Sequence, residues 1–410
     1  MRSRLLQKNG YRKNATVLLL TVAFLFGRGG IAVPAASAEA HGGTAAKVYE
    51  DTAAKIYGEV SAKVYGGFSA EKAVAGAGAA ASADPAALLS EGLTACAEVI
   101  DLRDASLSPA GLGQLYAALL LDSPALFHVA PRLSYGYAEE VVNGVPVRTV
   151  TEVYPVYTLT GAGLTAARAL YRETVAAILT EMEAVFGDRP RTEADTVLYL
   201  HDLLADRYAY DPRPEGEANA DAFRFFRDGT GLCQAYALAF TALCLGAGLE
   251  AHTVVSDAMD HAWNHVRVEG AWYHVDVTRD DPIPAEGGHP TVGHTRLLRS
   301  DRGMEALGYR DYTCAGEHAC TDTRFEATDG GAALEAFTQS LRFWGGVWMG
   351  MDDSGGIVAA KIQKEGVFIG QVGDTNLNGV FDPADLLGVY DVSLPEAWRE
   401  WMRTALTKGT

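Results

Sequence analysis

The spacing of apolar and polar positions predicts a helix followed by a β-hairpin in the middle of the chain. An apolar run over residues 237–245 suits a largely buried helix that opens at Cys233 and ends near Gly246 and Gly248. Residues 262–268 alternate as a strand, Gly270 provides a turn, and residues 271–277 form a second strand. Opposite residues in such a hairpin have numbers that sum to about 539, so His261 would face the neighbourhood of Asp276.

The pattern on either side is mixed. Upstream it predicts a helix around residues 112–121, strands around 133–137 and 145–157 joined by an Asn143-Gly144 turn, and a long helix over 164–186. Downstream, residues 343–351 and 357–369 predict a small β unit. Helices and strands are thus mixed along the chain, which is interpreted as an α+β fold.

The N-terminus has the pattern of a secretory signal. Basic residues precede an apolar run over residues 15–26, and Ala36-Ser37-Ala38 forms a cleavage sequence. The run is short for a membrane span, and Arg28 interrupts its continuation, so cleavage after Ala38 is favoured over a retained anchor. The sequence therefore predicts a protein that is secreted or associated with the cell surface.

Charge and cysteine content narrow the classes of partner. Loss of residues 1–38 leaves 28 basic and 52 acidic residues, which changes the formal charge from −18 to −24. Such an acidic surface argues against nucleic acid and anionic membranes as partners. A chain of 410 residues can bury a full hydrophobic core without disulfide bonds, and it has only five cysteines. Export would still permit a disulfide between Cys314 and Cys320.

A low-complexity stretch follows the predicted signal. Residues 45–68 form three octads that each contain Lys-Val-Tyr or Lys-Ile-Tyr, and residues 73–83 are rich in Ala and Gly. Three short units cannot build a solenoid core, so this stretch is interpreted as a spacer. The repeated Lys-Val/Ile-Tyr leaves open an adhesive or cross-linkable tag.

The candidate chemistry begins at the predicted helix. Gly231 is interpreted as a flexible lead-in, and Cys233 lies in the first turn, where unpaired N–H groups and the positive end of the helix dipole favour a thiolate. His261 would take the thiol proton, and Asp276 would hold the imidazole by its other nitrogen. The oxyanion would be held by the backbone N–H of Cys233 and an upstream donor, for which the candidates are Tyr208, Tyr210 and Gln234.

This chemistry is acyl transfer. The Cys233 thiolate would attack a carboxamide or peptide carbonyl, and His261 would protonate the departing amine, which leaves an acyl-enzyme. A lysine amine as acceptor gives cross-linking, whereas water gives hydrolysis, and the sequence does not choose between them. No cofactor is required for catalysis.

Three stretches together resemble the transglutaminase-like superfamily, a branch of the papain-like cysteine enzymes. They are Gly231-Leu232-Cys233 with Tyr236-Ala237, His261-Ala262-Trp263-Asn264, and Trp272-Tyr273-His274-Val275-Asp276-Val277-Thr278 followed by Asp280-Asp281-Pro282. The resemblance implies Cys233 as nucleophile, His261 as base and Asp276 as its orienting acid, on a Cys-bearing helix packed against an antiparallel sheet. It covers about residues 95–325, including residues 199–204 and 208–211, which are similar to a helix and turn that precede the cysteine in bacterial members.

Other interpretations apply to some of these residues. Trp263 is most simply a core aromatic, although its place beside the base makes it a candidate for the acyl pocket together with Tyr236 and Tyr210. His265 and His274 are interpreted as structural. His261 and His265 lie four apart on one strand face and form, with Asp276, an alternative candidate for a metal site, but no further ligand pair has a recognised zinc spacing.

The C-terminal region predicts a calcium loop. Oxygen ligands recur over Asp374 to Asp385 with Gly379 at the sharp turn, as a calcium ion with six to eight oxygen ligands demands. The predicted ligands are Asp374, Asn376, Asn378, Val380 through its carbonyl, Asp382 and Asp385. The last position is Asp rather than Glu, and the loop resembles one of the two repeats of a dockerin. The resemblance implies a cohesin-type scaffold partner; an acidic turn without metal is the alternative.

The sequence thus predicts six regions. They are a signal peptide at 1–38, a repeat and linker segment at 39–84, an α/β lead-in region at 85–190, a transglutaminase-like catalytic core at 191–330, a small β unit at 331–372 and a dockerin-like tail at 373–410. The predicted activity is acyl transfer from a protein or peptide amide to an amine or to water. The alternatives are a cysteine peptidase or amidase with the same triad and a non-catalytic surface or scaffold-associated binding protein.

Overall fold

The computed structural model describes residues 18–21, 83–211, 213, 219–281, 292–314, 318–326, 334–337, 340–344, 347–351, 357–363 and 366–371. The chain divides into two compact units, and the main boundary falls between Thr165 and Ala166 inside helix α4 (Gly161–Phe186). The predicted lead-in region 85–190 is therefore shared between the two units. The long helix predicted over 164–186 is confirmed by α4.

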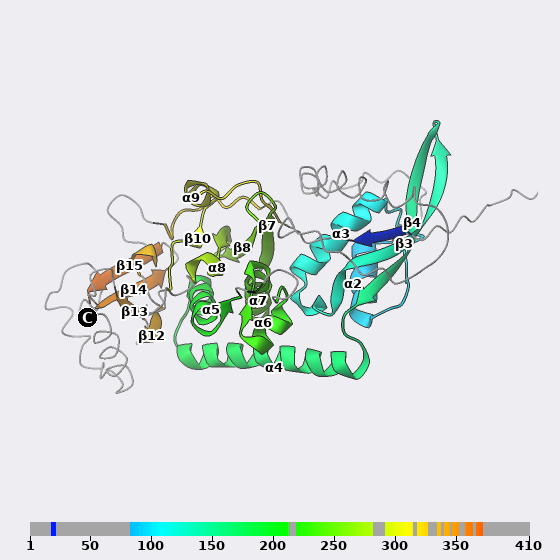
Figure 1. The fold of residues 1–410 in the computed structure, drawn as a ribbon. Helices are drawn as coiled ribbons and strands as arrows, with labels where there is room; N and C mark the ends of the chain where they lie inside the picture. Colours follow the sequence, from blue (N-terminus) through cyan, green and yellow to red (C-terminus); the bar gives the residue numbers. More distant parts are fainter. Residues whose placement is uncertain are drawn as a thin grey trace, which may run out of the picture. The chain divides into compact units, whose positions relative to one another are not determined.

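The first unit is built on a four-stranded sheet with the order β1-β3-β4-β2 (Figure 1). Its strands are β1 (Leu18–Thr21), β2 (Ile100–Asp101), β3 (Val129–Val142) and β4 (Val145–Tyr157). Its helices are α2 (Pro85–Ala95) and α3 (Pro109–Asp122) as far as Leu120. The end of α3 and most of the 3₁₀ turn η1 (Pro124–Leu126) are assigned to the second unit. The Asn143-Gly144 turn is confirmed, because both residues have the positive φ that a tight hairpin turn requires.

The sequence predicted this unit incompletely. Helix α2 was not predicted. Strand β3 extends past the predicted 133–137 to Val142, and this part of the strand was missed because its valines are exposed and show no alternation of buried and exposed positions. Strand β1 lies within the predicted signal segment; the rest of residues 1–38 and the octads lie outside the described residues. Export stays a prediction. No helix in the described ranges is long and apolar enough to cross a membrane.

The second unit contains a five-stranded sheet with the order β10-β9-β8-β7-β11. Its strands are β7 (Ala251–Ser256), β8 (His261–Val268), β9 (Ala271–Val275), β10 (Leu297–Arg299) and β11 (Thr313–Cys314). The predicted hairpin register is confirmed: Asn264 faces Val275 and Val268 faces Ala271. A one-residue slip would have moved His261 to the opposite face of the sheet.

Helices accompany this sheet, and the buried helix α7 (Cys233–Gly246) lies against β7 and β8 (Figure 1). The others are α5 (Glu193–Arg207), α6 (Ala222–Asp228), α8 (Val277–Asp280) and α9 (Asp301–Ala306), with a short parallel pair β5 (Ala209–Tyr210) and β6 (Thr230–Gly231) before α7. The predicted start and end of the Cys233 helix are confirmed.

The interpretation of Gly231 as a flexible lead-in is corrected by its surroundings. A Cβ at this position would lie 2.7 Å from Ala235 Cβ and 2.7 Å from Phe225 Cδ2. Its φ is not in the left-handed region. Glycine is required here because the chain passes too close to α6 and α7 for any side chain, which holds the start of the Cys233 helix against them.

The predicted small β unit is a four-stranded meander with the order β12-β13-β14-β15. Its strands are β12 (Arg342–Trp344), β13 (Val347–Met351), β14 (Ile357–Gln363) and β15 (Gly366–Gln371), preceded by the 3₁₀ turn η2 (Leu334–Ala336). Trp348 is 1% exposed and belongs to the same apolar core as α5 and α7. Its indole N–H donates to Asp195 Oδ1 at 2.7 Å, so the meander is packed into the second unit.

Candidate active site

Cys233 is the first residue of α7. The N-cap Leu232 provides no side-chain hydrogen bond to the helix end. The thiol side chain is 5% exposed and packs with Ala237 of its own helix and Ala262 of β8. A thiol at a helix N-terminus experiences the positive end of the helix dipole, which favours its thiolate form.

His261 begins β8 and lies between Cys233 and an acid. Its Nε2 is 2.6 Å from Asp276 Oδ2, and both side chains are buried. Because Asp276 occupies Nε2, Nδ1 is the ring nitrogen left free to interact with Cys233, which helps raise the pKa of His261. The structure thus brings together the three side chains of the predicted triad, Cys233, His261 and Asp276.

The electrostatics of the pair favour an imidazolium beside a carboxylate. Burial alone would lower the pKa of His261, but the charge of Asp276 and the hydrogen bonds from Asp276 and Cys233 outweigh it and raise this pKa to about 9. Burial alone would raise the pKa of Asp276, yet the charge and hydrogen bond of His261 lower it below its ordinary value. The ring is therefore held protonated through neutral pH.

Asp276 is fixed from three directions. It is the N-cap of α8, and its Oδ1 accepts from the backbone N–H of Arg279 at 3.1 Å. Its own N–H donates to the Arg296 carbonyl at 3.1 Å. The Tyr309 hydroxyl donates to Oδ2, the oxygen that also binds His261. Sequence reasoning missed Tyr309, which lies 33 residues from Asp276 with no local pattern to mark it.

A second buried histidine, His201 of α5, lies next to Asp280, the last residue of α8. His201 is fully buried, with Nδ1 2.8 Å from Asp202 Oδ1 and Nε2 3.5 Å from Asp280 Oδ2. Burial opposes its charge, but the hydrogen bonds to Asp202 and Asp280 raise the pKa of His201 to about 9. A cation between two carboxylates therefore joins α5 to α8, four residues after Asp276.

The three predicted pocket residues occupy different environments. Trp263 is 1% exposed and stacks on the His261 ring, with centroids 5.7 Å apart and an interplanar angle of 21°. Tyr236 is 1% exposed and donates its hydroxyl to Asp281 Oδ2 at 2.5 Å. Tyr210 is half-buried, on a strand position paired with Gly231. Burial places Trp263 and Tyr236 as supports of the site; a pocket role stays a prediction for all three.

The candidates for the oxyanion donor remain open. Tyr208 stacks on Phe225 with centroids 4.5 Å apart, and Gln234 is 8% exposed in the first turn of α7. Nothing in these contacts selects one of them over Tyr210.

The alternative metal site is not assembled. His265 Nε2 lies 3.1 Å from His274 Nδ1, so His265 is grouped with His274 rather than with His261 and Asp276. In the part of the chain that the structure describes, the two clusters with metal-ligand side chains both exclude His261. The predicted calcium ligands from Asp374 to Asp385 lie outside the described residues.

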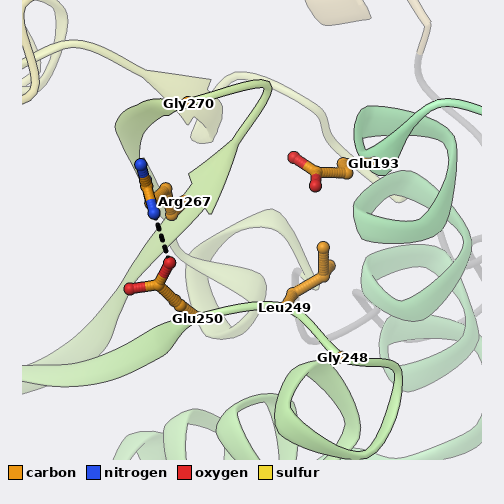
Figure 2. Close-up of a pocket in the computed structure, with 6 residues that line it drawn as sticks. All are labelled: Glu193, Gly248, Leu249, Glu250, Arg267 and Gly270. Atoms are coloured by element: carbon orange, nitrogen blue, oxygen red, sulfur yellow. Dashed lines mark hydrogen bonds and ion pairs between the residues drawn. The ribbon is translucent and has the colours of Figure 1, made fainter.

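A surface hollow of about 210 Å³ lies at the other end of the β8–β9 hairpin (Figure 2). It is lined by Glu193, Gly248, Leu249, Glu250, Arg267 and Gly270. Arg267 and Glu250 form an ion pair at its edge. With a rise of about 3.3 Å per residue along β8, this hollow is roughly 20 Å from His261, and no triad residue lines it.

Comparison with known proteins places this arrangement in a class. Residues 183–277 match the sequence profile of the Transglutaminase-like superfamily, and all three triad positions fall within this range. The chain therefore contains a transglutaminase-like domain on a mixed helix and sheet fold. No curated protein sequence matches the chain.

Solved structures give weak similarities. One is a TGase crystal structure, with 14% identity, 35% of this chain and 44% of that chain covered, and a TM-score of 0.24. A candidate protease from Parabacteroides distasonis has 13% identity, coverage of 34% and 35%, and a TM-score of 0.21. A candidate cysteine protease from Cytophaga hutchinsonii has 17% identity, coverage of 45% and 72%, and a TM-score of 0.22. The chain thus spans less than half the length of the first two.

Proposed function

We propose that this protein is a secreted transglutaminase-like cysteine enzyme that forms a thioester acyl-enzyme at Cys233 on a protein or peptide amide. The observation that carries this proposal is the placement of the His261 ring, with Nε2 2.6 Å from Asp276 Oδ2 and with Cys233 near enough to help raise its pKa. The match of residues 183–277 to the transglutaminase-like profile supports it.

Each group in the proposed reaction has a stated task. The Cys233 thiolate attacks the amide carbonyl, the C–N bond breaks, and the leaving amine takes the proton from His261 Nδ1. The backbone N–H of Cys233 holds the oxyanion. His261 then accepts a proton from the incoming amine or water as that group attacks the thioester and the Cys233 thiolate departs, which restores the thiolate–imidazolium pair. Asp276 keeps the ring oriented throughout.

The test follows the acyl group. The purified protein and its Cys233→Ala variant would be incubated with a labelled primary amine and a casein-like protein and examined by mass spectrometry. We expect label incorporation into casein that is lost in Cys233→Ala, while Cys96→Ala in the first unit retains it. Absence of any thioester, amine adduct or cleaved chain with the wild-type protein would contradict an acyl-transfer enzyme.

Hydrolysis by the same triad is the second candidate function. The superfamily match does not distinguish amine from water as acceptor, and two of the similar structures are described as candidate proteases. Chain cleavage without amine incorporation in the same assay would identify a peptidase or amidase.

A non-catalytic binding protein is the third candidate. Cys233 would then be an ordinary buried thiol. Iodoacetamide at neutral pH separates the two cases, because a thiolate paired with an imidazolium alkylates readily, whereas a protonated thiol does not. Failure of Cys233 to alkylate would favour the binding protein.

The N- and C-terminal regions extend the proposal. We infer that residues 1–38 direct export and that Asp374, Asn376, Asn378, Asp382, Asp385 and the Val380 carbonyl bind one structural calcium ion. A cohesin-type scaffold protein is the proposed partner of this tail. Calorimetric titration with calcium should release heat that Asp374→Ala abolishes; absence of heat with the wild-type chain would remove the metal. N-terminal sequencing of the exported protein should begin at Glu39.

A further inference from the structure

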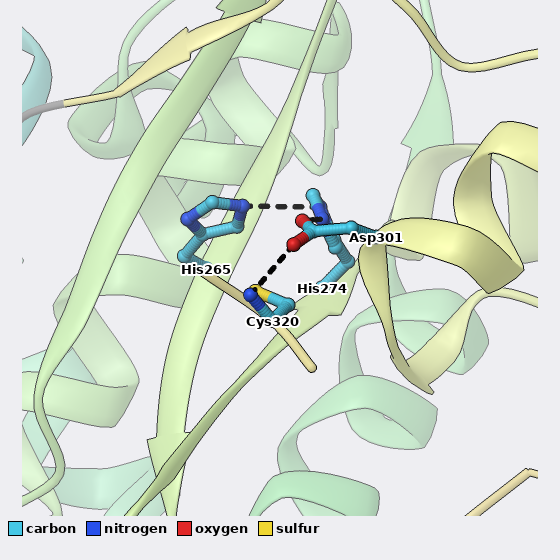
Figure 3. A group of neighbouring side chains, drawn as sticks. All are labelled: His265, His274, Asp301 and Cys320. Atoms are coloured by element: carbon cyan, nitrogen blue, oxygen red, sulfur yellow. Dashed lines mark hydrogen bonds and ion pairs between the residues drawn. The ribbon is translucent and has the colours of Figure 1, made fainter. Parts of the chain in front are cut away.

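A cluster of four metal-ligand side chains lies beside the β8–β9 hairpin, away from the predicted triad residues (Figure 3). His265 on β8 and His274 on β9 are directly opposite in the hairpin register. Asp301 begins α9, and Cys320 follows β11. One ligand atom from each lies within 4.8 Å of the other three, so four separate elements converge on one point.

The cluster is enclosed but has an edge toward solvent. His265, His274 and Cys320 are at most 1% exposed, whereas the Asp301 side chain is 32% exposed. Cys320 is a thiol in the structure, not half of a disulfide. The Asp301 edge provides an entry path for an ion into an otherwise closed site.

Hydrogen bonding leaves this cluster with a conflict at one nitrogen. The Trp263 indole only donates, so His274 Nδ1, 2.9 Å away, accepts, and the His274 proton is on Nε2, 2.9 Å from Asp301 Oδ1. His265 Nε2 lies 3.1 Å from the same His274 Nδ1. Either two donors share one lone pair, or two lone pairs face each other. A cation between the two imidazoles would remove the conflict.

The second cluster of metal-ligand side chains among the described residues, His201, Asp202 and His294, has no such conflict between two nitrogens. Both nitrogens of His294 face oxygen acceptors, the Phe337 carbonyl and Asp202 Oδ1, each at 3.0 Å. His201 lies between two carboxylates. Both ring nitrogens of His294 are therefore committed to oxygen, and no two nitrogens compete for one hydrogen bond here, although His201 Nε2 is buried without a hydrogen-bond partner.

We propose that His265, His274, Asp301 and Cys320 form a structural site for a divalent transition-metal ion, with Zn²⁺ as the ion that fits best. Two nitrogen ligands at about 2.0 Å from a tetrahedral zinc are roughly 3.3 Å apart, close to the observed separation of the two imidazoles. One thiolate and one carboxylate neutralise the two charges of the ion. Imidazole and thiolate ligands select against calcium and magnesium, which take oxygen.

Outer hydrogen bonds support this ligand set. Asp301 accepts from the Tyr312 hydroxyl and from the Cys320 backbone N–H, each at 2.9 Å. Such contacts orient ligating carboxylates in metal sites. The ion would compete with the Trp263 indole N–H for the His274 Nδ1 lone pair.

The test measures metal directly, independently of any acyl transfer. Purified protein, dialysed without chelator, should retain roughly one zinc ion per chain by elemental analysis. Replacement by Co²⁺ should give the visible bands of a tetrahedral site and a near-ultraviolet thiolate-to-cobalt band. In Cys320→Ser the charge-transfer band should vanish and the metal affinity should fall at least about tenfold. Cys96→Ser, which removes a thiol from the first unit, should change neither.

A second variant keeps the test valid if Cys320→Ser does not fold. Asp301→Asn preserves volume and should bind zinc at least about tenfold more weakly while its circular dichroism stays that of the wild type. Wild-type protein without metal, metal binding unaltered in folded Cys320→Ser or Asp301→Asn, or a native disulfide between Cys314 and Cys320 would each overturn the site. Amine incorporation into casein by Cys233 is scored separately, so either proposal can fail alone.

Discussion

The side-chain amide of Asn264 donates to the backbone carbonyl of Ala237 at 2.9 Å and to Thr241 Oγ1 at 2.9 Å. Ala237 and Thr241 lie on the helix that Cys233 begins, and Asn264 lies on the strand that His261 begins. One buried amide therefore connects the element that carries the thiol to the element that carries the base.

Replacing this amide should loosen the helix from the sheet. Asn264→Ala leaves a buried carbonyl and a hydroxyl without their donor, so the free energy of unfolding should fall by about 1–3 kcal/mol. Urea unfolding measures it. Asn264→Asp keeps the volume but loses the donors and should be at least as destabilising; wild-type stability in both variants would show that the connection is unimportant.

The pKa of His261 sets an alkaline limit for acyl transfer. In the proposed reaction His261 donates a proton to the leaving amine, so the rate should fall as pH rises through about 9, where the ring loses that proton. Alkylation of Cys233 by iodoacetamide needs only the thiolate and should not fall over the same range.

The carboxylate of Asp276 raises the pKa of His261 and thereby sets the pH at which acyl transfer should decline. In Asp276→Asn the alkaline limit of amine incorporation should move to lower pH by roughly 1–3 units, because the carboxylate that raises the pKa of His261 is gone. Rate–pH profiles of the two proteins provide the measurement. An unchanged limit would mean that a group other than His261 titrates there.

Tyr309→Phe should have a cost that depends on pH. The hydroxyl donates to a carboxylate with a lowered pKa, so its contribution is present above the ordinary value of 3.8 and is lost as pH falls through the lowered pKa. Urea unfolding should show a loss of about 1.5–3 kcal/mol at neutral pH and a smaller loss in acid. Tyr116→Phe is the control, because that hydroxyl donates to the neutral Ala130 carbonyl, and its cost should not change with pH.

His201 should stabilise the protein most below neutral pH. Its pKa is raised from 6.5 to about 9, so the stabilisation is fully present below pH 6.5 and is lost as pH rises through about 9. In His201→Gln the loss of stability between these values should be smaller than in the wild type. If the free energy of unfolding of the wild type and of His201→Gln changed in the same way with pH, His201 would not be a charged ring between Asp202 and Asp280.

The C-terminal meander should prove to be part of the second unit's core. Trp348→Ala removes a buried indole that packs on Phe186, with centroids 6.0 Å apart, and donates to Asp195, so unfolding should cost about 3–5 kcal/mol less. Val147→Ala at the exposed hairpin tip should stay within about 0.5 kcal/mol of wild type. If Trp348→Ala lowered the free energy of unfolding no more than Val147→Ala, the meander would not be part of the core.

Local patterns were enough to predict the elements that carry the triad. The helix that begins at Cys233 follows from its apolar spacing, and the hairpin register follows from strand alternation around Gly270. These features depend on residues close in sequence. The placement of His261 opposite Asp276 is a consequence of that register and was predictable for the same reason.

Other parts of the site depend on contacts between distant segments. Tyr309 reaches Asp276 from a loop 33 residues away, and Trp348 donates to Asp195 across 153 residues. His265 and His274 were interpreted as structural because no sequence spacing joins them to Asp301 and Cys320. The sequence also did not show that Gly231 is required because a Cβ would collide with Ala235 and Phe225.

The sequence by itself determined which residues could act as nucleophile, base and acid and which strands would oppose one another, because side-chain chemistry and hydrophobic period are local properties. Tertiary structure alone decided what surrounds them: the hydroxyl on Asp276, the indole on His261 and the four clustered side chains beside the β8–β9 hairpin. Such neighbours are set by how helices and strands pack around a common core, and packing brings together residues whose separation along the chain carries no information about their distance in space.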